Sequence, residues 1–232
     1  EHTQVHLNGV PISGETDGWF VDEDIRTLPL PALDIGENIL EVTVPIGRRT
    51  NLENFYLLGD FGVRVNGTLK TIIAPVRRLG FGDIVSQGLP FYTGNLLYKF
   101  QVQTTKPGLT IRAPRYRGGL IKVFVDGVDR GNIIYSPYTL HLPEIEAGTH
   151  EVTLRLYGTR YNGFAQLHHV QGVYFYQSPN SWRSEGDLWC YEYQFKPAGI
   201  LKSPEIYNGG HFIQPNGSIR EVRAQAHISD RS

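Results

Sequence analysis

Apolar and polar residues alternate with a period of two along several stretches of the chain. In residues 96–102, the apolar side chains fall on one face of an extended strand, and Lys99 and Gln101 fall on the other. The same alternation occurs at 38–44, 150–156 and 191–196. Asn-Gly or Asp-Gly pairs, which favour tight turns, occur at 8–9, 66–67, 126–127 and 162–163. The pattern predicts an all-β, antiparallel β-sandwich without a long amphipathic helix.

Five blocks of the first half of the chain recur in the second half, in the same order. Residues 5–10 match 123–128, 27–31 match 139–143, Gly36 matches Gly148, 41–44 match 151–154, and 47–51 match 158–162. The separation of matched residues is 118 in the first block, then 112, then 110 and finally 111. The first copy therefore has six additional residues, roughly 13–18. Ordered matches at nearly constant spacing indicate a duplication into two related halves.

The two copies differ in completeness. Strand-like segments at 96–103 and 109–113 precede the second copy, whereas only residues 1–4 precede the first. Either the first half borrows strands from elsewhere, or the chain is a fragment of a longer protein, which is the interpretation we favour. We expect a partial first half over 1–75, a more complete second half over 76–207, and a tail or linker over 208–232, with a late strand near 219–224 as its alternative.

The second copy contains a strand that ends in Asp126-Gly127, a hairpin with Tyr135-Ser136-Pro137-Tyr138, and a strand start at 148–152. This arrangement resembles the sugar-binding jelly roll of family 2 glycoside hydrolases. The first copy retains Asn8-Gly9 and residues 36–40, but it has Gly18-Trp19-Phe20 in place of the proline-aromatic hairpin. The resemblance implies a jelly-roll, galactose-binding-like sandwich.

Three further segments, at 51–63, 87–92 and 180–183, are similar to C-terminal regions of large bacterial α-L-rhamnosidase-like hydrolases. In such enzymes the catalytic acids lie in a barrel domain, and no such barrel fits in this chain. The resemblance therefore implies a non-catalytic accessory module. Its expected partners are a carbohydrate and the catalytic domain of the parent protein.

Composition and charge narrow the classes of function. The chain of 232 residues has a formal net charge of −1 and no basic stripe, so nucleic acid and anionic membranes are poor partners. No apolar run approaches the ~20 residues of a membrane helix. Cys190 is the only cysteine, and we expect it to be an inert core thiol in a strand over 188–191. The resemblance implies a bacterial protein, and both a cytoplasmic and a secreted location stay open.

Sugar binding requires an aromatic ring beside polar groups, because the C–H face of a pyranose stacks on the ring while its hydroxyls need hydrogen-bond partners. Residues of this kind in expected loops are the candidate ligand-binding residues: Trp19, Tyr135, Tyr161, Asn162, His168, Trp182 and Arg183. Trp182 is the strongest candidate, because residues 178–181 have the composition of an exposed loop. Asp187 and Glu192 are the candidate ligands of a structural calcium ion. No other cofactor is expected.

Three functions remain after these considerations. The favoured one is an accessory carbohydrate-recognition module of a glycoside hydrolase. The first alternative is a purely structural sandwich that supports a neighbouring catalytic domain. The second is a glycosidase in its own right, which would need two carboxylates roughly 5 Å or roughly 6.5–9.5 Å apart. The sequence does not pair any two of its carboxylates in this way.

Overall fold

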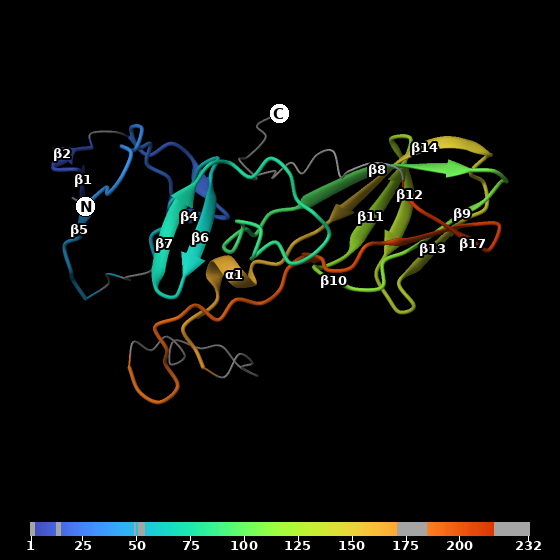
Figure 1. The fold of residues 1–232 in the computed structure, drawn as a ribbon. Helices are drawn as coiled ribbons and strands as arrows, with labels where there is room; N and C mark the ends of the chain where they lie inside the picture. Colours follow the sequence, from blue (N-terminus) through green and yellow to red (C-terminus); the bar gives the residue numbers. More distant parts are fainter. Residues whose placement is uncertain (1–2, 13–14, 49, 51–53, 171–184, 216–232) are drawn as a thin grey trace. The chain divides into compact units, whose positions relative to one another are not determined.

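The computed structural model describes residues 3–12, 15–48, 50, 54–170 and 185–215 (Figure 1). They divide into two compact units, with unit 1 ending at Gly59 and unit 2 beginning at Asp60. The predicted all-β architecture is confirmed, since several antiparallel sheets account for nearly all the regular structure. The predicted domain boundary after residue 75 lies inside unit 2, and the division into 1–75, 76–207 and 208–232 stays a prediction.

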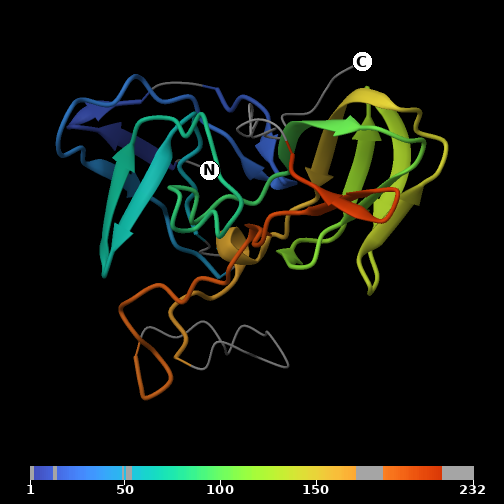
Figure 2. The same ribbon diagram turned by 45° about the vertical axis from the view of Figure 1, so that its right-hand side comes forward.

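Unit 2 contains a sandwich of two four-stranded antiparallel sheets (Figure 2). One sheet has the order β12-β11-β14-β8 and the other the order β13-β9-β16-β17. Their bounds are β8 Leu96–Thr104, β9 Leu109–Arg112, β11 Ile121–Val125, β12 Val128–Ile133, β13 Thr139–Leu142, β14 Gly148–Leu156, β16 Glu205–Asn208 and β17 His211–Ile213. Residues 208–213, expected to belong to a tail, are thus part of the sandwich. The possible late strand at 219–224 lies outside the described residues.

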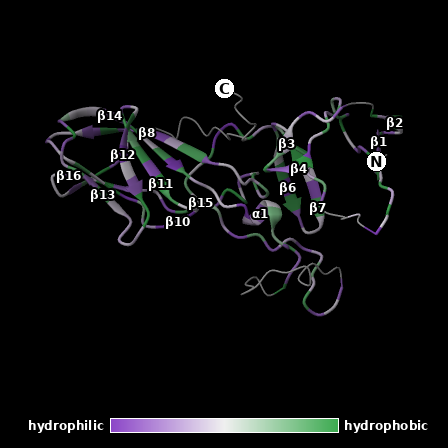
Figure 3. Ribbon diagram, turned by 180° about the vertical axis from the view of Figure 1, so that it is seen from behind, coloured by the Kyte–Doolittle hydropathy of each residue, from purple (hydrophilic) through white to green (hydrophobic). Residues whose placement is uncertain are grey.

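The core lies between these two sheets, and the alternation along the strands determines which side chains fill it. Apolar and polar residues alternate visibly along β8 (Figure 3), which pairs with β14 from Leu96↔Leu156 to Thr104↔Gly148. The side chains on the apolar face of β8 are buried, and so are the apolar side chains in the C-terminal half of β14. Burying one such aliphatic side chain stabilises the fold by roughly 1.5–3 kcal/mol. The fully buried Tyr98 also accepts a hydrogen bond from the Ile200 backbone N–H at 3.2 Å.

The remaining elements of unit 2 are short. β6 (Gly62–Asn66) and β7 (Leu69–Ile73) form a hairpin, and β10 (Tyr116–Arg117) pairs with β15 (Gly199–Ile200). Helix α1 (Tyr161–Phe164) contains the Asn162-Gly163 pair, so the turn predicted there is wrong. The strands predicted at 188–191 and 191–196 are also wrong. Within the described ranges, residues 191–196 pair with no strand, and Trp189 forms an isolated bridge with His169.

Unit 1 has a three-stranded sheet with the order β2-β1-β5. β1 spans Gln4–Leu7, β2 Val10–Pro11 and β5 Leu40–Thr43, while β3 (Trp19–Phe20) and β4 (Asp22–Arg26) form a separate hairpin. Among the described residues of unit 1, Leu7 is the one buried apolar residue. Unit 1 therefore has very little core of its own within the part of the chain that the structure describes.

The repeat is visible in the geometry of the two units, and it corrects one predicted match. β1 pairs with β5 at Leu7↔Leu40, and β11 pairs with β14 at Val125↔Val152. Leu40 of β5 and Val152 of β14 therefore correspond to each other, and they are 112 positions apart, as Gly36 and Gly148 are. The predicted separation of 110 for the block 41–44 is wrong. A shift of two residues leaves the same side chains on the same face of a strand, so alternation alone does not distinguish the two alignments.

Candidate functional site

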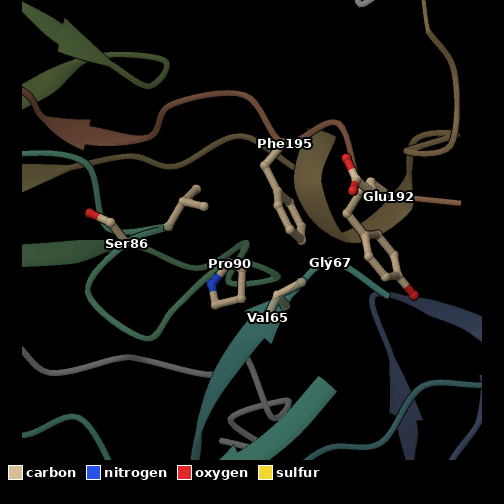
Figure 4. Close-up of a pocket in the computed structure, with 8 residues that line it drawn as sticks. Val65, Gly67, Ser86, Pro90, Glu192 and Phe195 are labelled. Carbon is tan, nitrogen blue, oxygen red and sulfur yellow. The ribbon is translucent and has the colours of Figure 1, made fainter. Parts of the chain in front are cut away.

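A hollow of about 330 Å³ on unit 2 brings together residues from three segments. The hairpin β6–β7 contributes two of the lining residues, the loop over 85–90 contributes three, and the irregular segment over 192–195 contributes three. They are Val65, Gly67, Val85, Ser86, Pro90, Glu192, Tyr193 and Phe195. Figure 4 shows the Phe195 ring directed toward Pro90 and Val65. Aromatic and aliphatic side chains and polar groups therefore line the hollow together.

The two lining rings Tyr193 and Phe195 belong to a larger group of packed rings, which we call the aromatic cluster: Phe91, His168, Trp189, Tyr191, Tyr193 and Phe195. Tyr193 and Phe195 are stacked, with ring centroids 5.4 Å apart and planes inclined by 11°. Phe91 meets both rings edge-on, at 5.2 and 5.0 Å. The His168 ring lies 4.4 Å from that of Tyr193. These contacts hold the two lining rings in fixed positions.

Trp189 and Tyr191 extend the aromatic cluster toward solvent. The Trp189 ring lies 5.8 Å from that of His168 and 4.3 Å from that of Tyr191. Tyr191 is 72% exposed. An exposed tyrosine at the edge of a packed aromatic group offers both an apolar ring and a hydroxyl to a ligand.

Hydrogen bonds from side-chain and backbone groups hold the irregular segment against α1 and the residues after it. The buried Asn162 side chain donates to the Lys196 carbonyl at 2.8 Å and accepts from the Lys196 N–H at 3.0 Å. The Gln194 N–H donates to the Leu167 carbonyl at 2.6 Å, and the Cys190 N–H donates to the His168 carbonyl at 2.8 Å. Residues 190–196 are therefore held without belonging to a sheet.

Two lysines accompany the rings. The Lys70 ammonium donates to the Tyr193 hydroxyl at 3.2 Å and lies 5.2 Å from the centre of its ring. The Lys196 ammonium lies 3.9 Å from the centre of the Tyr161 ring, where the negative face of the ring attracts a cation. The Glu192 carboxylate is exposed at the hollow. The site thus combines rings with both signs of charge.

Cys190 lies beside this segment and is half-buried. Its thiol donates to the Glu192 carbonyl at 3.2 Å and accepts from the Gln194 side-chain amide at 3.4 Å. The predicted placement of this thiol in the core is wrong, because the segment around it crosses the surface near the hollow rather than pairing inside the sandwich.

The structure brings together some of the predicted ligand-binding residues and separates others. His168 belongs to the aromatic cluster, the Tyr161 ring lies beside the Lys196 ammonium, and the Asn162 side chain is occupied by its two bonds to the Lys196 backbone. Tyr135 is 82% exposed in the loop after β12, outside the hollow. Trp19 is in β3 of unit 1, and Trp182 and Arg183 lie outside the described residues.

The residues that sequence reasoning missed are Tyr193 and Phe195. Their alternation with Glu192 and Gln194 is typical of a half-buried strand, so the pattern predicts that their side chains lie on a core face. Lys70 and Phe91 also carry no local signal, because they reach the site only through the tertiary packing of the β6–β7 hairpin and the loop after residue 90. The density of aromatic residues between 189 and 195 was the one available indication.

Asp187 and Glu192, the candidate calcium ligands, are both exposed. Within the described ranges, no group of three or more His, Cys, Asp or Glu side chains is arranged to hold a metal ion. The calcium site stays a prediction. None of the described helices has the length and apolar character needed to span a membrane.

The similarities found to known proteins are to solved structures. No protein-family model matches the chain, and no curated protein matches it. The chain is similar to a rhamnosidase from Novosphingobium sp. PP1Y, with 18% sequence identity and a TM-score of 0.38. The match covers 88% of this chain and 20% of that chain, so the chain spans about a fifth of the length of the structure that it matches.

Proposed function

We propose that this chain is a non-catalytic carbohydrate-recognition module that accompanies a glycoside hydrolase, and that the sugar binds in the hollow over Tyr193 and Phe195. The observation that supports this most strongly is the pair of stacked, half-buried rings at the wall of a hollow that also contains polar groups. The resemblance of the second half of the chain to sugar-binding jelly rolls points in the same direction.

The chemistry of the hollow suits a sugar. Its apolar walls match the C–H face of a pyranose ring, and the Phe195 ring is directed into the space (Figure 4). The hydroxyl groups of a sugar would donate hydrogen bonds to the Glu192 carboxylate and to the Ser86 hydroxyl oxygen. The Ser86 hydroxyl itself already donates to the Asp83 carbonyl at 2.9 Å. A volume of about 330 Å³ falls within the lower range of small-molecule sites. A mono- or disaccharide is the ligand of matching size.

Binding is a better proposal than hydrolysis for this hollow. Hydrolysis requires two carboxylates that flank the glycosidic bond. Among the described residues that line the hollow, Glu192 is the one carboxylate. A single acceptor contributes to affinity and orientation without providing the acid and base pair.

The purely structural alternative is favoured by a different observation, the poor core of unit 1. Several of its apolar side chains are more than 40% exposed: Val10, Ile35, Ile39, Leu40, Ile46, Phe55, Leu57 and Leu58. Large exposed apolar areas commonly mark protein interfaces. This alternative predicts docking to a catalytic domain and no affinity for sugars.

Isothermal titration of the whole chain against a panel of mono- and oligosaccharides tests the proposal. Glu192→Gln and Ser86→Ala alter polar groups of the hollow and leave its rings in place, so we expect both to weaken binding of the active glycan several-fold. Tyr135→Ala removes an exposed ring outside the hollow and serves as the matched control. The proposal fails if no glycan binds to folded protein, or if only the Tyr135 variant loses affinity.

A further inference from the structure

The sheet β2-β1-β5 of unit 1 repeats three strands of the larger sheet in unit 2. β1 and β2 correspond to β11 and β12, since both hairpins turn over two residues between Leu7↔Val10 and Val125↔Val128. β5 corresponds to β14 through the pairings Leu7↔Leu40 and Val125↔Val152. The positions of these three strands therefore have counterparts whose surroundings are known from unit 2.

The two sheets differ at one edge. In unit 2 the far edge of β14 pairs with the whole length of β8. In unit 1, the residues that the structure describes include no strand on the far edge of β5. Leu40 is 45% exposed, whereas its counterpart Val152 is fully buried. An unpaired edge next to exposed apolar side chains is a site for addition of a strand.

We propose that the free edge of β5 binds an extended peptide segment with the chemistry of β8, in antiparallel register. In unit 2, Phe100 pairs with Val152, Lys99 with Thr153 and Tyr98 with Leu154. The corresponding partners on β5 are Leu40, Glu41 and Val42. The segment that fits this edge has two large apolar residues separated by one basic residue.

Charge complementarity is the reason for the basic residue. Glu41 stands where unit 2 has the uncharged Thr153, and it is exposed. In unit 2, the Lys99 ammonium already reaches the Glu151 carboxylate, two positions away from its direct partner Thr153, at 3.8 Å. A cation directly opposite Glu41 forms a favourable cross-strand pair, and an anion there is unfavourable.

The same charge disfavours a second copy of this chain as the occupant. Two β5 edges that pair antiparallel across a twofold axis bring their two Glu41 side chains near one another, and neither edge offers a basic residue over Leu40–Thr43. A heterologous, basic and apolar strand is the partner that the edge fits.

Titration of the whole chain with a synthetic peptide of the β8 sequence, residues 96–104, tests this proposal. We expect the peptide to bind, and Glu41→Lys to weaken that binding by about threefold to tenfold. A peptide with glutamate in place of the lysine that corresponds to Lys99 is expected to bind Glu41→Lys better than wild type. Restored binding by this exchanged pair identifies a direct contact.

The matched control is Thr153→Lys, the same change at the corresponding position of unit 2. It weakens binding only if the peptide replaces β8 in its own sandwich. Absence of peptide binding, insensitivity to Glu41→Lys, or greater sensitivity to Thr153→Lys would each overturn the proposal. So would a dimer in sedimentation experiments that Glu41→Lys strengthens, since it would identify a second copy as the occupant. The test involves neither the hollow nor any sugar, so its outcome is independent of the proposed function.

Discussion

Asn8 and Asp126 occupy the same place in two separate units and make the same hydrogen bond. The Asn8 side-chain oxygen accepts from the Ile39 N–H at 2.8 Å, and the Asp126 side-chain oxygen accepts from the Glu151 N–H at 2.9 Å. Both residues have a φ of 52°, in the left-handed region that asparagine and aspartate tolerate. The duplication is therefore preserved in backbone geometry and side-chain bonding, as well as in sequence.

The glycine that follows in each turn gives the first prediction. Gly9 and Gly127 have φ values of 77° and 78°, and a Cβ added at either would contact nothing within 4 Å. The cost of Gly9→Ala or Gly127→Ala is therefore one of backbone strain alone, about 1 kcal/mol in each case. Equilibrium denaturation checks this, with the free energy of unfolding compared with that of the wild type. A loss near zero would contradict the left-handed turn.

The ion pair between Asp126 and His150 predicts a pH dependence of stability. His150 Nδ1 lies 2.7 Å from the Asp126 carboxylate. That hydrogen bond raises the pKa of His150 above its ordinary value, against the opposing effect of burial. Burial acts to raise the pKa of Asp126, but the hydrogen bonds from His150 and the Glu151 N–H outweigh it and hold that pKa below its ordinary value.

The sign of the two contributions follows from these shifts. The contribution of His150 is complete below its unfolded pKa, near 6.5, and is lost as the pH rises through the higher folded value. That of Asp126 is complete above its unfolded pKa, near 4, and is lost as the pH falls through the lower folded value. Wild type should therefore exceed His150→Gln in stability most clearly between about pH 4 and 6.5. Thermal unfolding of both proteins from pH 3 to 9 measures this, and a constant difference would refute it.

The third prediction concerns the support of the hollow. Asn162→Ala removes both hydrogen bonds to Lys196 and leaves two backbone groups without these partners. We expect a loss of about 1–3 kcal/mol in the free energy of unfolding, together with weaker sugar binding. Asn162→Asp is the matched control, because it keeps the acceptor for the Lys196 N–H and loses only the donor. An affinity that is unchanged in Asn162→Ala would show that residues 192–195 do not depend on this anchor.

The alternation of apolar residues was sufficient to predict the sandwich and several of its strands. β8 and β14 follow the pattern closely, because one face of each is buried against the opposing sheet. The same alternation at Tyr191, Tyr193 and Phe195 has a different cause. Tyr193 and Phe195 stack on each other, with Phe91 and His168 against them, and Tyr191 packs on Trp189. Among the residues that the structure describes, no strand pairs with this segment.

The candidate site was harder to predict because its parts are distant in sequence. Lys70 and Tyr193 are 123 positions apart, and their contact depends on how the β6–β7 hairpin meets the segment after Trp189. Of the residues predicted to bind a ligand, His168 belongs to the aromatic cluster and the Tyr161 ring lies beside the Lys196 ammonium, and a ligand-binding role for either stays a prediction. Tyr135 and Trp19 were chosen for the same chemical reason, but neither lines the hollow. The residue types indicated what kind of ligand the chain could bind, and only the tertiary fold indicated where the candidate site lies.

The central claim is that a carbohydrate binds in the hollow over Tyr193 and Phe195. Two-dimensional amide NMR of the labelled chain, recorded while a bound glycan is titrated, tests it most directly. The account predicts that the largest chemical-shift changes fall on residues 65–70, 85–91 and 192–196, and that the surroundings of Tyr135 and Trp19 stay unchanged. Shifts centred on Tyr135 or Trp19, or no shifts with any glycan of the panel, would contradict it.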